Sequence, residues 1–131
     1  MTKITENDIE LLCIEELEAL GFQYLYGPDI GTDGERPERQ SWDEVLLRDR
    51  LRSAIQRLNP DLPQGIQDDA LKTITRIHSP ELVVDNEQFH QYLTDGIEVV
   101  YRKDGQQRGD KVWLIDFEKP ENNEFLVVNQ F

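Results

Sequence analysis

Cysteine is almost absent from this chain of 131 residues, which contains only Cys13. A single thiol can form neither an internal disulfide nor a cysteine-based metal site. Cys13 lies within an apolar helical pattern, so we expect it to be a small core residue. The chain also lacks an apolar run long enough to cross a bilayer, and "MTKITENDIE" lacks the layout of a secretory signal. We therefore expect a cytoplasmic protein without a membrane partner.

Positive charge is also scarce. The chain has 14 basic and 27 acidic residues, which gives a formal net charge of −13. Such a charge repels polyphosphate at long range, whereas proteins usually bind duplex DNA with lysine and arginine. The acidity has two interpretations: it keeps a small domain soluble, or it forms an acidic surface that docks on a basic partner.

The sequence shows no complete catalytic or metal-binding motif. The glycine-rich segment "GPDIGTDG" lacks the lysine of a phosphate-binding loop. No serine lies in a strand-to-helix turn that would expose a nucleophile. His78 and His90 have no second ligand at metal-binding spacing. We expect both histidines to be surface or capping residues.

Helical signals fill the first two thirds of the chain. Thr5 and Asp8 form a capping pattern, and Gly21 supplies a left-handed stop, which predicts a helix over residues 5–20. The expected buried face of this helix consists of Ile9, Leu12, Cys13, Leu17 and Leu20. "FQYLYG" alternates like a short strand, and "GPDIGTDGERPERQ" is rich in charge, glycine and proline. We expect the latter to be an exposed loop.

Three further helices are predicted before residue 97. Ser41 and Glu44 suggest a cap for a helix over residues 42–58, and apolar spacing predicts a helix from Pro63 towards Pro80. Asn86 is the expected cap of a fourth, short helix that ends at Gly96.

The last third of the chain has an extended character. "IEVVY", "KVWLIDF" and "EFLVVNQF" read as three strands, of which the first two form a hairpin. We expect one domain of the α+β class over residues 1–131, with helices over 1–96 and an antiparallel sheet over 97–131.

Three groups of charged residues could contribute to a binding or catalytic site, and each also has a structural interpretation. Glu6 and Glu10 lie one helical turn apart, so they could hold a divalent cation or remain solvated. Asp116 lies between apolar residues, and it could instead cap the following "ENN" turn. The densest basic patch lies in "RDRLRSAIQR", where salt bridges to the surplus acids are the favoured interpretation over phosphate contacts.

The order of these segments resembles a known family. The segments "TENDIELLCIEELEALGFQYLYGPDI", "LRDRLRSAIQRLNPDLP", "NEQFHQYLTDGIEVVYR" and "VWLIDFEKPENNEFLVVNQF" resemble the N-terminal region of the restriction, or motor, subunit of type I restriction-modification enzymes. The most specific parts are "RLNPDLP" and "IDFEKPENNEFLVVNQF", and the resemblance covers nearly the whole chain.

The resemblance implies a nuclease domain of the PD-(D/E)xK type. In such domains an aspartate on one strand and a Glu-x-Lys on the next bind Mg²⁺ and activate water. The family places that strand pair directly after the segment that ends at Phe131, so the resemblance implies that the chain stops before the catalytic strand pair. This fragment would scaffold the nuclease core of a parent that cleaves unmodified DNA, and we expect it to be inactive and to bind no cofactor by itself.

The resemblance also implies site residues and partners. A glutamate on the first helix, about three turns before the glycine that ends it, faces the metal in many such nucleases, and Glu10 stands there relative to Gly21. Glu10 is therefore the candidate auxiliary metal-site acid and Glu6 the second candidate, although either could be a solvent-facing carboxylate. ATP would serve the motor of the parent, and methylation and specificity subunits would connect the complex to DNA.

The alternative function is an acidic interaction module or DNA mimic without catalysis. The C-terminal strand separates the two hypotheses, because a mimic should close its own core. A nuclease fragment should leave the strand over residues 125–131 open, so we predict self-association through it or marginal stability.

Overall fold

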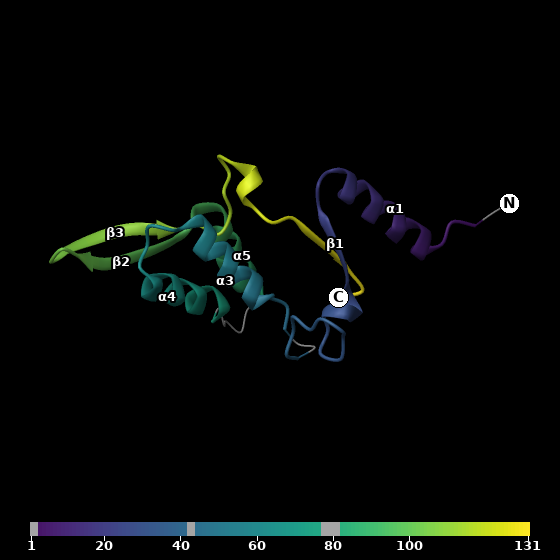
Figure 1. Ribbon diagram of the computed structural model, residues 1–131, viewed down its shortest axis with the longest axis horizontal. Helices are drawn as coiled ribbons and strands as arrows, with labels where there is room; N and C mark the ends of the chain where they lie inside the picture. The colour runs from purple at the N-terminus through teal and green to yellow at the C-terminus, as the bar shows by residue number, and fades with distance from the viewer. Residues whose placement is uncertain (1–2, 42–43, 77–81) are drawn as a thin grey trace. The chain divides into compact units, whose positions relative to one another are not determined.

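A computed structural model describes residues 3–41, 44–76 and 82–131 of the chain. The chain forms two compact units. Unit 1 consists of residues 1–47 and 124–131, and unit 2 consists of residues 48–123. The α+β class is confirmed by the mixture of helices and strands (Figure 1).

Unit 1 begins with helix α1 (Glu6–Ala19), which confirms the first predicted helix. The capping box is formed: the Thr5 backbone N–H donates to Asp8 Oδ2 at 2.9 Å, and the Asp8 N–H donates to Thr5 Oγ1 at 3.2 Å. The bond from the Thr5 backbone N–H is the main cause that lowers the pKa of the Asp8 carboxyl below its usual value. Gly21, at φ +101°, follows the end of the helix as expected.

The predicted buried face of α1 is wrong. Ile14 is the buried residue of the helix, Glu10 and Leu17 are half-buried, and Cys13 is exposed. The other exposed apolar residues of the predicted face are Ile9, Leu12 and Leu20. The apolar residues of α1 are distributed all around the helix axis, so the sequence does not indicate which face is buried. Contact with the strands of unit 1 determines the buried face.

The two strands of unit 1 come from opposite ends of the chain. Strand β1 (Gln23–Tyr26) pairs in parallel with β4 (Leu126–Asn129), with Gln23 opposite Leu126 and Tyr26 opposite Asn129. The third predicted strand therefore exists, but the expectation that it joins an antiparallel sheet with the hairpin is wrong. Alternation of residue types indicates a strand but does not indicate which strand it pairs with. A parallel pair also needs a long connection, so its two strands are far apart in the sequence. Self-association through β4 stays a prediction.

The segment between β1 and unit 2 is not the exposed loop that its composition predicts. It contains the short helix α2 (Gly27–Ile30), and Ile30 is only 1% exposed. Arg39 is also buried, and its guanidinium lies 4.0 Å from the centre of the Phe131 ring. A cation over an aromatic face is a favourable contact, so a charged residue of this segment helps to build the interior of unit 1.

Unit 2 contains helices α3 (Arg48–Leu58), α4 (Gln64–Thr75) and α5 (Leu82–Asp95). Two predicted starts are wrong. The Glu44 N–H donates to the Ser41 carbonyl in a turn, and α3 begins only at Arg48. Helix α5 begins at Leu82, so Asn86 is an internal residue and not its cap. The predicted stop at Pro80 lies outside the described residues. Within the described parts of the chain, no helix is long and apolar enough to span a membrane.

The predicted hairpin of unit 2 is confirmed. Strand β2 (Ile97–Lys103) pairs antiparallel with β3 (Gln106–Val112). Asp104 and Gly105 form the turn with φ of 56° and 77°, as a two-residue hairpin turn of type I′ requires. Figure 1 shows the hairpin extending beyond α3 and α4 from its base near the helices.

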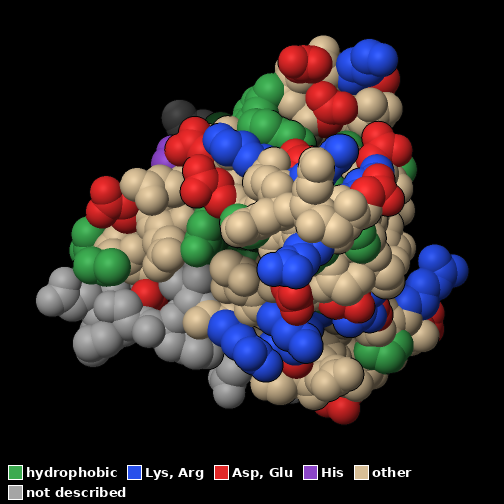
Figure 2. Space-filling model, turned by 90° about the vertical axis from the view of Figure 1, so that its left-hand side faces the viewer, with side chains coloured by type: hydrophobic (Ala, Val, Ile, Leu, Met, Phe, Trp, Pro, Cys, Tyr) green, Lys and Arg blue, Asp and Glu red, His purple; other side chains and the backbone are tan. Residues whose placement is uncertain are grey.

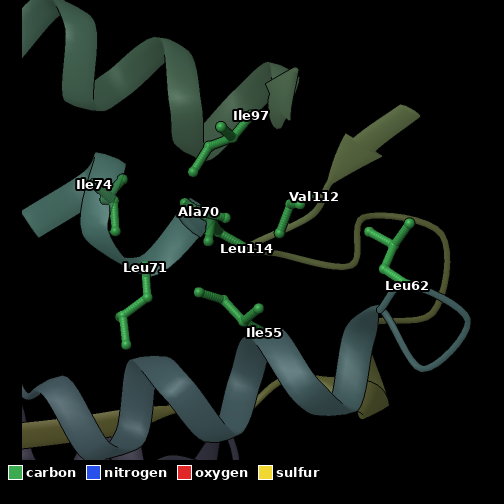
Figure 3. Packing of buried hydrophobic residues seen from close by; sticks show 8 residues of the cluster. All are labelled: Ile55, Leu62, Ala70, Leu71, Ile74, Ile97, Val112 and Leu114. Atoms are coloured by element: carbon green, nitrogen blue, oxygen red, sulfur yellow. The ribbon is translucent and has the colours of Figure 1, made fainter. Parts of the chain in front are cut away.

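The core of unit 2 lies where α3, α4 and the base of the hairpin meet. Figure 3 shows Ile55 of α3 and Ile74 of α4 pointing towards Ile97 and Val112, the residues that pair at the hairpin base. All four are at most 3% exposed. Phe89, Tyr92 and Leu93 of α5 pack against this cluster, as their spacing predicts. The other core members are Leu62, Ala70, Leu71 and Leu114.

Candidate functional site

Glu10, the first candidate for a metal-site acid, is partly buried in unit 1. Helix α1 contacts both β1 and β4. Glu10 is half-buried and lies four residues before the buried Ile14 and seven before Leu17, so it shares the face of the helix that meets the strands. Glu6, one turn earlier, is exposed. The two candidate acids therefore differ in position, and Glu10 is the one directed to the packed side of the helix.

The carboxyl end of the parallel strand pair is held by one amide side chain. Asn129 Oδ1 accepts a hydrogen bond from the Tyr24 hydroxyl at 2.9 Å and one from the Gly27 N–H at 3.4 Å. Gly27 lies so close to the backbone of Asn129 and Gln130 that it has no room for a Cβ atom. In open α/β sheets ligands bind outside the carboxyl ends of strands, and here that end is rigidly defined.

The described residues do not assemble a metal site of their own. No group of three or more His, Cys, Asp or Glu side chains comes together within the described parts of the chain. Mg²⁺ requires octahedral coordination by oxygen, usually one or two carboxylates together with waters and substrate phosphates. Glu10 could therefore supply one such ligand, but the described residues do not bring together a complete set.

Asp116 is a structural residue, as the alternative interpretation of the sequence proposed. Its Oδ1 accepts from the N–H groups of Glu118 at 3.1 Å and Lys119 at 2.9 Å, and its Oδ2 accepts from the Asn122 side chain at 3.0 Å. Asn123 completes the loop, donating to the Asp116 carbonyl and accepting from its N–H, both at 2.8 Å. The "DFEKPENN" segment, which includes the short 3₁₀ helix η1 (Pro120–Asn122), is thus held by its own side chains.

Asp116 gives unit 2 a predicted pH dependence. The Asn122 side chain, followed by the Lys119 N–H, lowers the pKa of the Asp116 carboxyl below its usual value. The folded-state pKa is thus below the unfolded one, so the contribution to stability is present above about pH 4 and is lost as pH falls through the folded pKa. We expect Asp116→Asn to melt below the wild type at pH 7 in thermal scans, with a difference that shrinks towards pH 2. A difference that is constant with pH would contradict this explanation.

Asn59 is the residue that the sequence interpretation missed. Its side-chain Nδ2 donates to the carbonyls of Ile55 and Trp113, each at 2.8 Å, and its Oδ1 accepts from the Trp113 N–H at 2.8 Å. Asn59 is 5% exposed, and it joins the end of α3 to the chain directly after β3. The available signal was "RLNPDLP", which follows the end of the predicted helix over residues 42–58 and carries part of the family resemblance.

The arginine-rich helix makes local contacts. Arg52 forms an ion pair with Asp49 at 3.7 Å, which confirms the favoured interpretation for this residue. Arg57 Nε donates to the Asn122 carbonyl at 2.7 Å and so connects α3 to the Asp116 loop. His90 is exposed in α5, as expected, and His78 lies outside the described residues.

A surface hollow of about 400 Å³ lies beside the Asp116 loop. Trp113, Phe117 and Asp116 contribute to its lining. Both Asp116 oxygens already accept hydrogen bonds within the loop. The Asp116 carboxylate therefore stabilises the loop, and its hydrogen bonds do not indicate a catalytic role in the hollow.

Comparison of the sequence with known proteins finds a family that matches nearly the whole chain. Residues 3–131 match the family described as the type I restriction enzyme R protein N terminus. The type I restriction enzyme HindI endonuclease subunit of Haemophilus influenzae is 39% identical over 127 residues, which are 97% of this chain and 12% of that protein. A Methanocaldococcus jannaschii protein, provisionally named type I restriction enzyme MjaIXP endonuclease subunit, is 33% identical over 123 residues, 94% of this chain and 12% of that protein. No solved structure matches the chain.

These matches define the class as endonuclease subunits of type I restriction enzymes, and they confirm the resemblance. The chain belongs to the family of type I restriction enzyme R protein N termini. It spans about one eighth of the length of the two relatives, each of which is named as an endonuclease subunit.

Proposed function

We propose that this region is part of a PD-(D/E)xK-type nuclease domain and scaffolds its catalytic core. The parent subunit would cleave unmodified double-stranded DNA in an ATP- and Mg²⁺-dependent manner, together with methylation and specificity subunits. The supporting observation is the position of Glu10, half-buried on the face of α1 that meets the parallel pair β1 and β4. A carboxylate on the face of a helix that packs against strands has fewer accessible positions than a fully exposed one, which favours cation binding.

Each element of unit 1 has a defined part in this proposal. Helix α1 sets the position of Glu10, and Ile14 beneath it keeps the helix against the strands. Asn129 and Gly27 define the carboxyl end of the strand pair. When bound, Mg²⁺ would neutralise charge on the scissile phosphate and lower the pKa of a water ligand. Glu10 would orient one ligand position, and the remaining acids and the lysine would come from the rest of the nuclease domain.

The contribution of Glu10 predicts a selective loss of cleavage. We expect Glu10→Gln in the parent subunit to lower the rate of DNA cleavage by at least about tenfold, because the neutral amide is a poorer Mg²⁺ ligand. The thermal stability should change little, since the side chain is only half-buried. The measurement is single-turnover cleavage of a plasmid substrate at several Mg²⁺ concentrations, with ATP hydrolysis measured in parallel.

Two variants of the same helix control this experiment. Glu15→Gln removes an exposed carboxylate from α1, and Glu6→Gln removes the second candidate. We expect Glu15→Gln to cleave as the wild type does, and Glu6→Gln to have the smaller effect of the two candidates. Equal cleavage by wild type and Glu10→Gln at limiting Mg²⁺ would remove Glu10 from the metal site.

The alternative of an acidic interaction module or DNA mimic has one supporting observation, the concentration of acid in unit 1. That unit has 13 acidic and three basic residues. The family assignment supports the restriction subunit instead, because both relatives are named as endonuclease subunits. A nuclease domain tethered to DNA-binding partners has a high effective concentration at DNA and tolerates such a charge.

A further inference from the structure

The basic residues of this chain are concentrated in one unit. Unit 2 has 11 of the 14 lysines and arginines against 14 acids, a net charge of −3, whereas unit 1 has a net charge of −10. The acidity that argues against nucleic-acid binding is therefore mainly a property of unit 1. Figure 2, viewed from the side on which Figure 1 shows the hairpin, has several Lys and Arg side chains gathered in its lower centre.

The hairpin tip of unit 2 carries three exposed cations without an ion pair to any described residue. Arg102, Lys103 and Arg108 are exposed, and Asp104 is the only acid between residues 101 and 108. None of the three cations has a carboxylate partner within 4 Å among the described residues. In a chain with 27 acids, cations without an intramolecular partner remain available to an external anion.

The two strands distribute these cations over both faces of the ribbon. Tyr101 pairs with Arg108 and Lys103 pairs with Gln106, so Arg108 and Lys103 lie on one face. Arg102 lies on the other face, opposite Gln107. The tip therefore presents positive charge in two directions, together with two glutamine amides that can donate hydrogen bonds.

The base of the hairpin is anchored in the core of unit 2. Ile97 and Val112 pair at the base and are 3% and 0% exposed within the core of unit 2. Residues 102–110 are all exposed, so the tip projects from a packed foundation. A two-stranded ribbon has dimensions that fit the major groove of B-DNA, with phosphates on both sides.

We propose that the tip of the β2–β3 hairpin, residues 102–108, is a DNA phosphate-contact surface of the restriction subunit. This inference rests on the proposed function and adds to it the surface by which the region meets its substrate. Duplex DNA is favoured over an acidic protein partner because the cations diverge over two faces of a narrow ribbon. An acidic protein surface would meet a single face, whereas phosphates line both walls of a groove.

The test removes the three positive charges of the hairpin tip in the full-length parent subunit. We expect the triple variant Arg102→Gln, Lys103→Gln, Arg108→Gln to bind a labelled 30-base-pair duplex at least tenfold more weakly at 50 mM salt. The slope of log K against log salt should fall in magnitude by about 2 to 3, because about 0.9 is lost for each phosphate contact removed. Fluorescence anisotropy between 50 and 200 mM salt measures both quantities.

A second triple variant controls for net charge. Lys3→Gln, Lys72→Gln and Lys119→Gln remove three exposed lysines elsewhere in the chain and change the net charge equally. We expect its affinity to stay within a factor of two of wild type. A direct contact is tested with Gln107→p-benzoylphenylalanine, which should crosslink to the duplex on irradiation, while the same substitution at the exposed Glu87 of α5 should not.

The outcomes separate this inference from the proposed function. If the wild-type polypeptide cleaves DNA but both triple variants bind alike, the hairpin surface is wrong and the nuclease function stands. Crosslinking from position 107 to a protein subunit instead of DNA would likewise overturn the inference in favour of an acidic partner. If the wild type fails to cleave DNA in the presence of Mg²⁺ and ATP, the proposed function fails whatever the hairpin binds.

Discussion

Replacing Asn59 with aspartate should lower the free energy of unfolding of unit 2 by about 4 kcal/mol at pH 7. The side-chain Nδ2 donates to two carbonyls, those of Ile55 and Trp113, at 2.8 Å. A carboxylate accepts hydrogen bonds only, so Asn59→Asp would place a buried negative charge against two carbonyl oxygens. The wild-type amide also accepts from the Trp113 N–H, and only this bond would survive. Chemical denaturation monitored by tryptophan fluorescence measures the change.

The same substitution at an exposed site provides the control. Asn86→Asp on α5 makes an identical chemical change where the side chain is exposed, and we expect an effect within about 0.5 kcal/mol. Acid should partly rescue Asn59→Asp, because burial favours the protonated carboxyl, which can donate one hydrogen bond. Asn59→Ala should cost about 2 kcal/mol. Equal stability of the two aspartate variants would show that the Asn59 bridge does not hold α3 to the end of β3.

Replacing Gly27 with alanine should destabilise unit 1 by about 3 kcal/mol. A Cβ atom at this position would overlap the Asn129 carbonyl oxygen and lie 2.6 Å from that of Gln130. Both are backbone atoms and cannot rotate away, so the chain after β4 would have to move from the start of α2. We expect faster amide hydrogen exchange at the Gln23 N–H, which donates to the Phe125 carbonyl at 2.8 Å beside the strand pair.

Gly65→Ala in α4 is the matched control for this effect. No atom lies within 4 Å of a Cβ added there, and its backbone is helical, so we expect a gain of about 0.5 to 1 kcal/mol. If the stability changes of the two glycine-to-alanine variants have opposite signs, glycine is required at position 27 because the neighbouring backbone leaves no room for a Cβ atom. If Gly27→Ala leaves exchange at Gln23 unchanged, the close approach of β4 to α2 is not required for the pair.

Local chemistry made several elements predictable from the sequence. The capping box of Thr5 and Asp8, the Asp104–Gly105 turn and the Gly96 stop each depend on residues within one turn of each other. The Asp116 loop belongs to the same class, since its bonds span at most seven residues. Such features follow from short-range sterics and hydrogen bonding, which the sequence contains explicitly.

The pairing of the last strand and the buried face of α1 could not be predicted in this way. Leu126 meets Gln23 across more than a hundred residues, and strand alternation carries no record of the partner. In α1 the apolar residues surround the helix, so Ile14 became buried and Cys13 exposed only through contact with the strands. The loop before α3 was misjudged because the burial of Arg39 depends on the distant Phe131 ring.

The sequence by itself determined the family, the α+β class and the candidacy of Glu10, because ordered motifs and local periodicity survive without any knowledge of contacts. Only the tertiary structure decided that Glu10 is half-buried while Glu6 is exposed, that Asn59 bridges two elements, and that the three cations of the hairpin tip have no carboxylate within 4 Å among the described residues. These three facts depend on which surfaces meet. Contacts between residues far apart in the chain are selected by packing and burial of the whole fold, which no short segment encodes.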